Sequence, residues 1–545
     1  MSTPTSTRTR SHWGWGFADR FPDGAARANL GKLLGARLGF EGLSVAEPVP
    51  LDAATIREPR IQPPSHSAAL CSSALTERAS HCYGKNYRDL IRAFSGRFEN
   101  APDIVARPTT EAQIAPLLDW ASSEGVAVIP FGGGTSVCGG VEGDVGDRYR
   151  GVLSLDLTGL DRVLELDDCS RLARIQAGAT VPQINRALGT HGLALRHYPQ
   201  SYELATLGGY IATRSGGHYA TLYTHIDELV AGTRMLTPSG VFETRCLPGS
   251  GAGPSPDRLV CGSEGILGVI TEAWIRIQAK PIFRGQASVH FSSFSNAVEA
   301  VRAVAQSGLN PANCRLLDPR EAALNMVAFD GSAVLILAFE SASQPIEALL
   351  RQALAIATAY EGRCPDGPRL RTTRAGDPDE GASGGEGAAK SWRQAFLDAP
   401  YLLNVCVSLG VIADTFETAV TWKRFAAFHE GVIARVRAAM KEACGMGRIS
   451  CRFTHVYPDG PAPYYTFLAP ARRGAEIEQW MAIKSAAGKA VVDLGGTITH
   501  HHAVGRVHRP DYDRQRPELF ARALSAARRA VDPAGIMNPG VLIDG

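Results

Sequence analysis

The chain has 545 residues, with 56 Lys and Arg against 54 Asp and Glu and a formal net charge of +2 at pH 7. This length exceeds what one hydrophobic core organises, so we expect two or more domains. The balanced charge argues against nucleic acid as a partner. No run of about 18 apolar residues and no secretory signal occurs, which predicts a cytoplasmic protein without a transmembrane segment.

The pattern of apolar residues changes first near residue 100. Residues 1–99 are irregular and locally rich in Pro, and they predict a helical lead-in that decorates a later core. Residues 100–280 predict one α+β domain. Strand-like runs at 104–105 and 126–130 flank a helical segment at 110–124 that begins at a Thr cap. This β-α-β unit leads directly into a glycine-rich turn.

A second change occurs near residue 280. Residues 281–490 predict another α+β domain, in which strands at 286–291 and 332–339 alternate with amphipathic helices. The stretch 372–390 is rich in Gly, Ala, Asp and Glu and predicts a surface loop within that domain. Residues 491–545 form a C-terminal segment that includes an amphipathic helix.

The glycine-rich turn is the first candidate for a binding site. It consists of Pro130, Phe131, Gly132, Gly133, Gly134, Thr135 and Ser136. Three successive glycines lack the Cβ atoms that block a close approach, and they permit positive φ, so several backbone N–H groups can converge on a pyrophosphate. An ordinary tight turn explains this stretch equally well when it is considered alone. A Walker loop and a Rossmann fingerprint are both excluded by the residues that follow.

Two later segments decide between these readings. Residues 200–217 are dense in small and hydroxyl side chains with few charges, which suits a flat, uncharged aromatic cofactor. Residues 262–270 again combine spaced glycines with a strand-like apolar run. Together with 130–137, they resemble the FAD-binding domain of the vanillyl-alcohol-oxidase-type (PCMH-type) flavoprotein superfamily.

Within that superfamily the chain is most similar to the alkyl-dihydroxyacetonephosphate synthase family. Family-like segments occur in the family's order at 13–16, 130–137, 206–215, 416–418 and 499–506, and so span nearly the whole chain. The resemblance implies an α+β fold with a PCMH-type FAD-binding domain and a second α+β cap domain for the substrate. It also implies helical terminal segments, the last of which packs back near the flavin.

The resemblance further implies the cofactor and the residues that hold it. FAD is expected to be bound non-covalently, because relatives with tethered flavin usually have a His where this chain has Thr135. The glycine-rich turn would hold the pyrophosphate. The rest of FAD would be lined by Gln200, Ser201, Tyr202, Glu203, Leu204, Ala205, Thr206, Thr213, Arg214, Ser215, Gly216, Glu264, Gly265, Ile266, Leu267, Gly268, Val269 and Ile270.

Three consecutive histidines, His500, His501 and His502, are the candidate catalytic group. If they lie in a strand, their side chains alternate between faces and cannot share one metal ion, so no metal centre is expected. The 11 cysteines contain no CxxC pair either. The histidines are then either polar residues at a strand end or proton carriers that titrate near neutrality. The resemblance favours the second reading, with abstraction of the substrate's C1 proton, and implies that Tyr464 is a proton donor.

One departure from the family concerns the substrate. The family pattern Tyr-x-Arg-Asp supplies an Arg for the substrate phosphate, whereas this chain has Leu403 at that position. Loss of a charge-assisted donor weakens such binding by roughly 1.5–3 kcal/mol, unless Arg506, Arg509 or Lys423 substitutes. Ala503 also replaces the glycine that usually follows the histidines.

The resemblance implies an enzyme of ether-lipid synthesis that exchanges an acyl group for a long-chain alcohol through an adduct at flavin N5. An FAD-linked oxidase or dehydrogenase of an alcohol or 2-hydroxy acid is the alternative that Leu403 keeps open. A non-catalytic flavin-fold protein is a third reading. The expected partner is a small-molecule or lipid substrate. The resemblance also implies a homodimer and peripheral membrane contact, since members of the family tend to have both, although no basic amphipathic helix is evident in this sequence.

Overall fold

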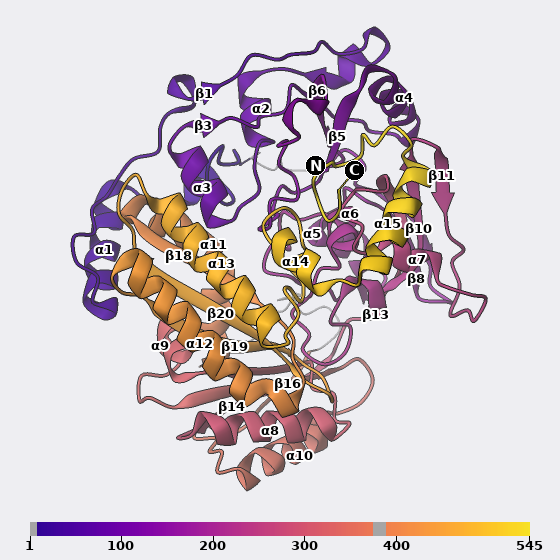
Figure 1. The fold of residues 1–545 in the computed structure, drawn as a ribbon. Helices are drawn as coiled ribbons and strands as arrows, with labels where there is room; N and C mark the ends of the chain where they lie inside the picture. The colour runs from indigo at the N-terminus through magenta and orange to yellow at the C-terminus, as the bar shows by residue number, and fades with distance from the viewer. Residues whose placement is uncertain (1–7, 374–387, 545) are drawn as a thin grey trace, which may run out of the picture.

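The structure is a computed structural model that describes residues 8–373 and 388–544 (Figure 1). Most of the surface loop expected at 372–390 therefore lies outside the described residues. The strand before it, β17 (Arg369–Thr372), and the helix after it, α11 (Ala388–Leu409), belong to the second half of the chain. The α+β architecture expected from the sequence is confirmed.

A small sheet carries the glycine-rich turn. Its four strands, in spatial order, are β2 (Cys71–Ser72), β4 (Ile104–Ala106), β6 (Gly151–Asp156) and β5 (Val126–Phe131). Strands β4 and β5 both run parallel to β6, and α4 (Ala115–Glu124) connects them, which confirms the β-α-β unit. A capping box at Thr110 begins the helical segment, and Gly125 ends α4 in the left-handed conformation. The turn therefore starts at the carboxyl end of a buried strand.

An antiparallel five-stranded sheet completes the first half of the fold. Its strands, in order, are β11 (Gly240–Glu243), β10 (Val230–Thr237), β12 (Val269–Arg276), β8 (Leu172–Gln176) and β7 (Val163–Asp167). Helices α5 (Val181–Gly189) and α6 (Leu207–Thr213) share its apolar core. Thr206 caps α6, so the segment rich in hydroxyl residues lies at the start of that helix.

The second half of the fold is built on a seven-stranded sheet. Beyond β17, its strands in order are β14 (Phe283–Phe291), β16 (Ala333–Ser341), β15 (Asn313–Leu317), β19 (Arg448–Val456), β20 (Pro461–Pro470) and β18 (Val411–Glu417). One core is shared between this sheet and α8 (Phe294–Gln306), α10 (Glu347–Ala359), α12 (Trp422–Cys444) and α13 (Glu476–Asp493). Figure 1 shows α8, α10 and α12 in the lower part of the molecule, and α13 above them.

The N-terminal segment differs from the expectation that it only decorates the core. Helix α3 (Tyr87–Phe94) packs against α11 and α13, and its apolar side chains belong to the core of the seven-stranded sheet. Asn404 of α11 also accepts a hydrogen bond from Trp15 N (2.8 Å) and donates one to Trp15 O (3.1 Å). This segment therefore joins the two halves of the fold. Its irregular sequence gave no sign of that role.

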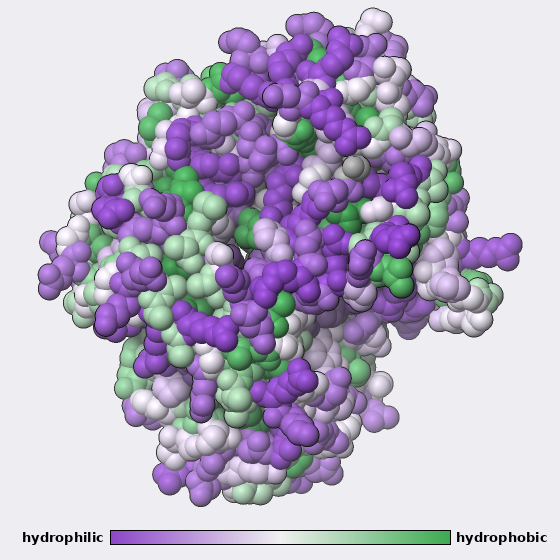
Figure 2. Space-filling view, in the orientation of Figure 1, coloured by the Kyte–Doolittle hydropathy of each residue, from purple (hydrophilic) through white to green (hydrophobic). Residues whose placement is uncertain are grey.

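The C-terminal helix α15 (Glu518–Val531) lies beside the first half of the fold, and Met537 forms an isolated parallel bridge with Val128 of β5 (Figure 1). Polar residues cover most of the face in Figure 2, with small apolar groups between them. Among the described helices, none combines the length and apolarity needed to cross a bilayer.

Candidate active site

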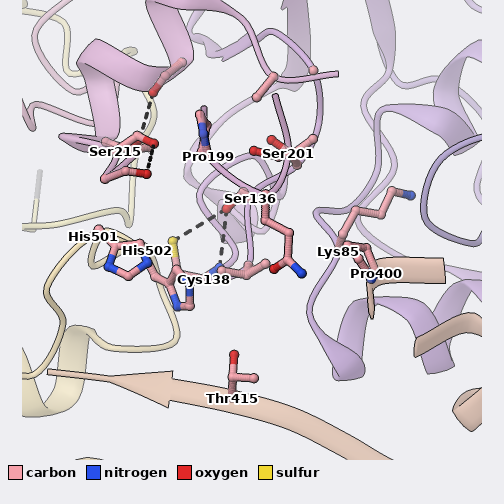
Figure 3. A pocket seen from close by; sticks show the side chains of 18 of the residues that line it. Lys85, Ser136, Cys138, Pro199, Ser201, Ser215, Pro400, Thr415, His501 and His502 are labelled. Atoms are coloured by element: carbon pink, nitrogen blue, oxygen red, sulfur yellow. Dashed lines mark hydrogen bonds between the residues drawn. The ribbon is translucent and has the colours of Figure 1, made fainter. Parts of the chain in front are cut away.

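A cavity of about 460 Å³ lies where the two halves of the fold meet. Its walls come from the glycine-rich turn, the start of α6, the stretch before β12, the seven-stranded sheet, α11 and the C-terminal segment. In Figure 3, His501 and His502 lie on one side, Lys85 and Pro400 lie opposite, and Ser136 lies between them. Segments separated by several hundred residues thus line one cavity.

The glycine-rich turn forms a cradle that tolerates no Cβ atom. A Cβ on Gly132 would clash with the Thr206 hydroxyl, and one on Gly133 would approach the Ala205 Cα to 2.8 Å. Gly134 has φ +65°, which favours glycine. Within the described chain, the N–H groups of residues 133–136 donate no hydrogen bond to protein atoms. Unused donors that face a cavity fit the pyrophosphate of FAD.

The predicted cofactor residues divide into two groups. The cavity is lined by Pro130, Phe131, Gly132, Gly133, Gly134, Thr135, Ser136, Gln200, Ser201, Ala205, Thr206, Thr213, Ser215, Gly216, Glu264, Gly265, Gly268 and Ile270. The cavity walls do not include Tyr202, Glu203, Leu204, Arg214, Ile266, Leu267 and Val269. Members of the second group act behind the wall: Leu204 packs beside Gly133, Ile266 and Leu267 are core residues, and Arg214 turns outward to Asp227.

The seven-stranded sheet presents one face to the cavity. On β20 the side chains of Tyr464, Thr466 and Leu468 line it, whereas Tyr465 and Phe467 point into the core. The same alternation on β19 exposes Arg452 and Thr454 to the cavity, as expected for a strand. This periodicity assigns Tyr464 to the site and Tyr465 to the core.

Tyr464 lies beside the histidines, as the family resemblance implies. Its hydroxyl donates to Thr415 Oγ1 (2.9 Å), and its ring lies 6.0 Å from His501 and 5.5 Å from His502, centroid to centroid. Burial raises the pKa of this phenol, although the neighbouring Arg452 opposes the shift. The phenol therefore remains protonated and able to donate.

The three histidines do not lie in a strand, so the alternation argued from the sequence was wrong. They follow α13 in an irregular turn, in which the backbone N–H groups of His500, His501 and His502 all donate to the Glu417 carboxylate at 2.6–3.1 Å. The Thr499 hydroxyl donates to the same carboxylate (2.5 Å). A single carboxylate at the end of β18 therefore shapes the turn.

The expectation that these imidazoles titrate near neutrality is also wrong. Burial lowers the pKa of His501 to about 3 and that of His502 to about 4, although Glu417 opposes both shifts. Burial by itself would raise the pKa of Glu417, but the imidazoles and the Thr499 hydroxyl hold it well below its usual range. At neutral pH the histidines are neutral bases beside a carboxylate that stabilises any proton they accept.

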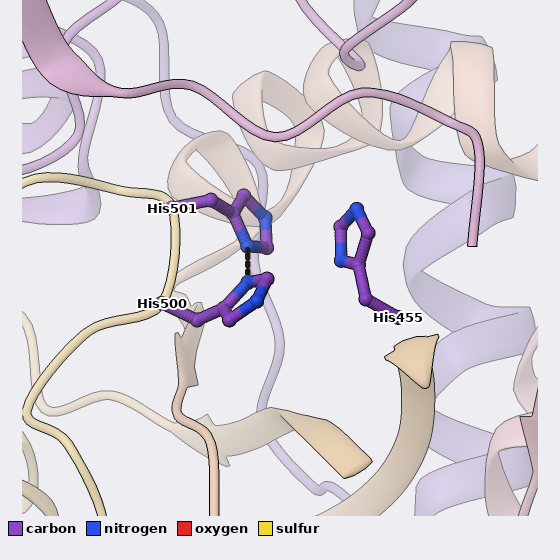
Figure 4. A group of neighbouring side chains, drawn as sticks. All are labelled: His455, His500 and His501. Atoms are coloured by element: carbon purple, nitrogen blue, oxygen red, sulfur yellow. Dashed lines mark hydrogen bonds between the residues drawn. The ribbon is translucent and has the colours of Figure 1, made fainter. Parts of the chain in front are cut away.

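His455 adds a third ring to this group. Ligand atoms of His455, His500 and His501 lie within 4.8 Å of one another, a spacing that would let them share a metal ion (Figure 4). At least one ring nitrogen of each histidine takes part in a hydrogen bond: His455 Nε2 with Gly217 O (3.1 Å), and His500 Nδ1 with His501 Nδ1 (3.0 Å). These bonds favour proton transfer over metal binding.

The predicted substrate residues occupy different places. Leu403 lines the cavity, within an apolar wall that also includes Leu34, Leu324, Leu402, Cys406 and Leu468. Arg506 does not line it, because its guanidinium donates to Glu142 O and Pro539 O. Arg509 is not among the lining residues either, and Lys423 is exposed on α12.

Two buried arginines of the cavity carried no signal in the sequence. Arg315 on β15 and Arg452 on β19 both line the cavity, and Arg452 pairs with the buried carboxylate of Glu321. The Arg452 guanidinium lies 3.9 Å from the centroid of the Tyr464 ring. The sequence around each arginine has the pattern of an ordinary half-buried strand. The two side chains come together only through the pairing of their strands. The role of Glu417 was missed as well, although its segment stood out as family-like.

The glycine cradle makes a direct prediction about cofactor retention. Gly133→Ala places a Cβ against the Leu204 carbonyl and the Ala205 backbone, so we expect purified protein with little bound FAD. The measurement is the flavin absorbance per protein at equal purity. Gly249→Ala is the matched control, because a Cβ there meets nothing within 4 Å. A variant at Gly133 that is as yellow as the wild type would contradict this role.

The buried histidines also predict a dependence of stability on pH. Unfolded imidazoles bind protons below about pH 6.5, whereas folded His501 and His502 stay neutral down to about 3 and about 4. Their contribution is therefore present above about pH 6.5 and lost as the pH falls. The double variant His501→Gln with His502→Gln lacks these imidazoles. When the pH is lowered from about 7 to about 5, its free energy of unfolding in urea should therefore rise relative to that of the wild type. An unchanged difference would refute the lowered pKa values.

Comparison with known proteins agrees with this geometry. The FAD binding domain family matches residues 102–245, and the C-terminal domain of FAD linked oxidases matches 280–542. Alkyldihydroxyacetonephosphate synthase of Trypanosoma brucei brucei is 30% identical over 86% of this chain and 77% of its own. The Caenorhabditis elegans protein of that name is 30% identical over 94% and 88%.

A solved alkyldihydroxyacetonephosphate synthase structure superposes with a TM-score of 0.79 at 22% identity, covering 97% of this chain and 98% of the other. That likeness extends to both halves of the fold and to the terminal segments. The matched relatives, the two FAD-linked domains and the glycine cradle together identify the chain as an FAD-dependent enzyme. It belongs to the alkyldihydroxyacetonephosphate synthase family.

Proposed function

We propose that this enzyme exchanges the acyl group of an acyl-dihydroxyacetone phosphate for a long-chain alcohol, a reaction of ether-lipid synthesis. The observation that carries the proposal is the composition of one cavity. It combines a phosphate cradle, proton-transfer groups, two buried guanidinium groups and an apolar wall. Each part suits a different portion of the reactants.

The cofactor end of the cavity fits FAD held without a covalent bond. When bound, FAD supplies an electron-accepting ring beside which C1 of the substrate can react. The glycine cradle would hold its pyrophosphate, and Thr135 offers no imidazole for a tether. We expect acid precipitation of the protein to leave FAD in the supernatant, where it is identified by its fluorescence.

Arg315 and Arg452 supply the positive charge that a phosphorylated substrate needs in the absence of an Arg at position 403. Both are buried, so their charge is screened little by water. Burial lowers the pKa of Arg315 to about 9, which leaves it protonated at neutral pH. Glu321 forms an ion pair with Arg452.

The apolar wall suits the alkyl and acyl chains. Each methylene that leaves water contributes about 0.8 kcal/mol, so a long chain gains much of its binding energy from such a surface. Leu403 belongs to this wall, beside Leu402 and Cys406 on α11. The loss of the family's Arg therefore extends the apolar surface near the reacting groups.

Proton transfer falls to the groups between these two ends. His501, neutral and facing the cavity, is the base, and Glu417 stabilises the proton that it accepts. Tyr464 stays protonated and donates a hydrogen bond to the leaving carboxylate. His502 lies on the other side of Glu417 and lines the same wall.

Leu403 favours a second candidate function, the oxidation of an alcohol or 2-hydroxy acid. Without the family's phosphate ligand, an alcohol or 2-hydroxy acid without phosphate would meet an apolar wall, and the same base would serve its oxidation. A homodimer, peripheral contact with a membrane and a cytoplasmic location remain predictions. Leu402 is 45% exposed at the edge of the apolar wall and offers a route for a lipid substrate.

The two functions are separated by one anaerobic comparison. With acyl-dihydroxyacetone phosphate and hexadecanol, we expect alkyl product, detected by mass spectrometry, and flavin that remains oxidised at the end. With a panel of 2-hydroxy acids, we expect no lasting bleaching of the flavin. Bleaching by a hydroxy acid without alkyl product from the phosphate would favour the dehydrogenase.

A substitution of Arg315 tests whether this residue binds the phosphate of the substrate. Arg315→Gln removes a charge-assisted donor worth roughly 1.5–3 kcal/mol, so KM for the phosphorylated substrate should rise about ten-fold to a hundred-fold. Arg320→Gln is the control, because that side chain is exposed next to the same strand. Equal KM values for both variants would remove Arg315 from phosphate binding.

A further inference from the structure

His501 is connected to a chain of hydrogen bonds that leads away from the cavity. His501 lines the cavity, but His500 lies behind it, with the two Nδ1 atoms 3.0 Å apart (Figure 4). His500 Nε2 then lies 2.7 Å from the Tyr457 hydroxyl. The buried base therefore has a neighbour that can pass its proton on.

The chain continues from Tyr457 to the surface. The Tyr457 hydroxyl donates to Thr224 Oγ1 (3.3 Å), and Thr224 Oγ1 donates to the carboxylate of Glu228 (2.9 Å). Thr224 is buried, whereas Glu228 is exposed. Five side chains from three separate segments thus connect the cavity with solvent without a gap wider than a hydrogen bond.

The acceptor at the outer end sets the direction of every bond. A carboxylate only accepts, so Thr224 donates to Glu228, Tyr457 donates to Thr224, and His500 Nε2–H donates to Tyr457. His500 Nδ1 then accepts from His501 Nδ1–H, which leaves the lone pair of His501 Nε2 free to accept a proton. All donors point outward from the cavity.

His225 holds this arrangement in place. Its Nε2 lies 2.9 Å from His500 O, a carbonyl that only accepts, so this nitrogen carries the proton. Its ring packs 4.5 Å from the His500 ring, centroid to centroid. Burial raises the pKa of Tyr457 to about 12, so the phenol gives up one proton only as it receives another.

We propose that His501, His500, Tyr457, Thr224 and Glu228 form a relay that exports a proton from the cavity to solvent. The inference rests on the proposed exchange, which needs such an exit. The C1–O bond to the acyl group breaks with its electron pair on the carboxylate, the C1–O bond to the alcohol forms, and the alcohol's proton is left over. His501 Nε2 takes that proton, and Glu228 releases one to water.

Variants that interrupt the relay test it during turnover. Tyr457→Phe and Thr224→Val each remove one hydroxyl, and we expect kcat to fall roughly ten-fold or more, as for loss of general acid–base catalysis. The solvent isotope effect on kcat should grow, and a small diffusible base such as imidazole should restore part of the rate. Thr224→Ser keeps the hydroxyl and should retain the wild-type isotope effect.

Matched controls separate the relay from ordinary packing. Thr221→Val removes a hydroxyl from the same loop that donates to Pro311 O, and Tyr465→Phe removes a core hydroxyl that bonds His429. Neither should change the isotope effect or respond to imidazole. If Tyr457→Phe or Thr224→Val behaves like its control while the wild type exchanges alkyl groups, the relay is refuted.

A measurement without substrate keeps this test independent of the proposed function. In protein labelled with 15N-histidine, the relay requires His500 to carry its proton on Nε2 and to keep Nδ1 unprotonated. Tyr457→Phe removes the acceptor for that proton and should shift the Nε2 resonance. A proton found on His500 Nδ1 reverses the direction of the bonds and overturns the relay. If the wild-type protein exchanges no alkyl group, the proposed function is refuted, and the NMR result still decides whether the hydrogen bonds run in the proposed direction.

Discussion

The active site depends on two buried carboxylates that hold one irregular turn between them. Glu417, at the end of β18, accepts the N–H groups of residues 500–502, and Glu264, before β12, accepts those of Val504 and Gly505 at 2.8 and 2.7 Å. One carboxylate comes from each half of the fold. A turn with so many buried N–H groups requires such acceptors, because an unpaired buried donor is costly. The histidines therefore stay in place only while both halves are joined.

The hydrogen bonds from this turn to Glu417 also explain the chemistry of the histidines. Their burial lowers the pKa values, and the carboxylate that shapes their backbone also stabilises a proton on their rings. A neutral base beside an anion accepts a proton more readily than an isolated buried imidazole. Structure and reactivity are thus two consequences of the same group, Glu417. The outward chain through Tyr457 gives that proton a destination.

The seven-stranded sheet contributes side chains to the cavity because successive residues of a strand point to opposite faces. Strand residues that face the cavity include Arg452 and Tyr464, and the residues next to them fill the core. The sheet therefore brings charge and a proton donor to the site without any loop. Leu403 on α11 adds apolar surface to the cavity wall.

The sequence by itself determined the β-α-β unit, the glycine-rich turn and the FAD family, and it singled out His500, His501, His502 and Tyr464 as candidate site residues. These are local signals: capping, glycine spacing and short motifs depend on neighbours in the chain. It did not determine that the histidines form a turn, that their pKa values are low, or that Arg506 lies away from the cavity.

Only the tertiary structure decided those points, because each depends on residues far away in sequence. Glu417 sets the conformation of the histidine turn across more than eighty positions, and burial by both halves of the fold sets the protonation. Arg315 and Arg452 meet only through the pairing of β15 with β19. A buried charge and its partner leave no periodic trace in the chain, whereas a strand, a helix or a phosphate turn does.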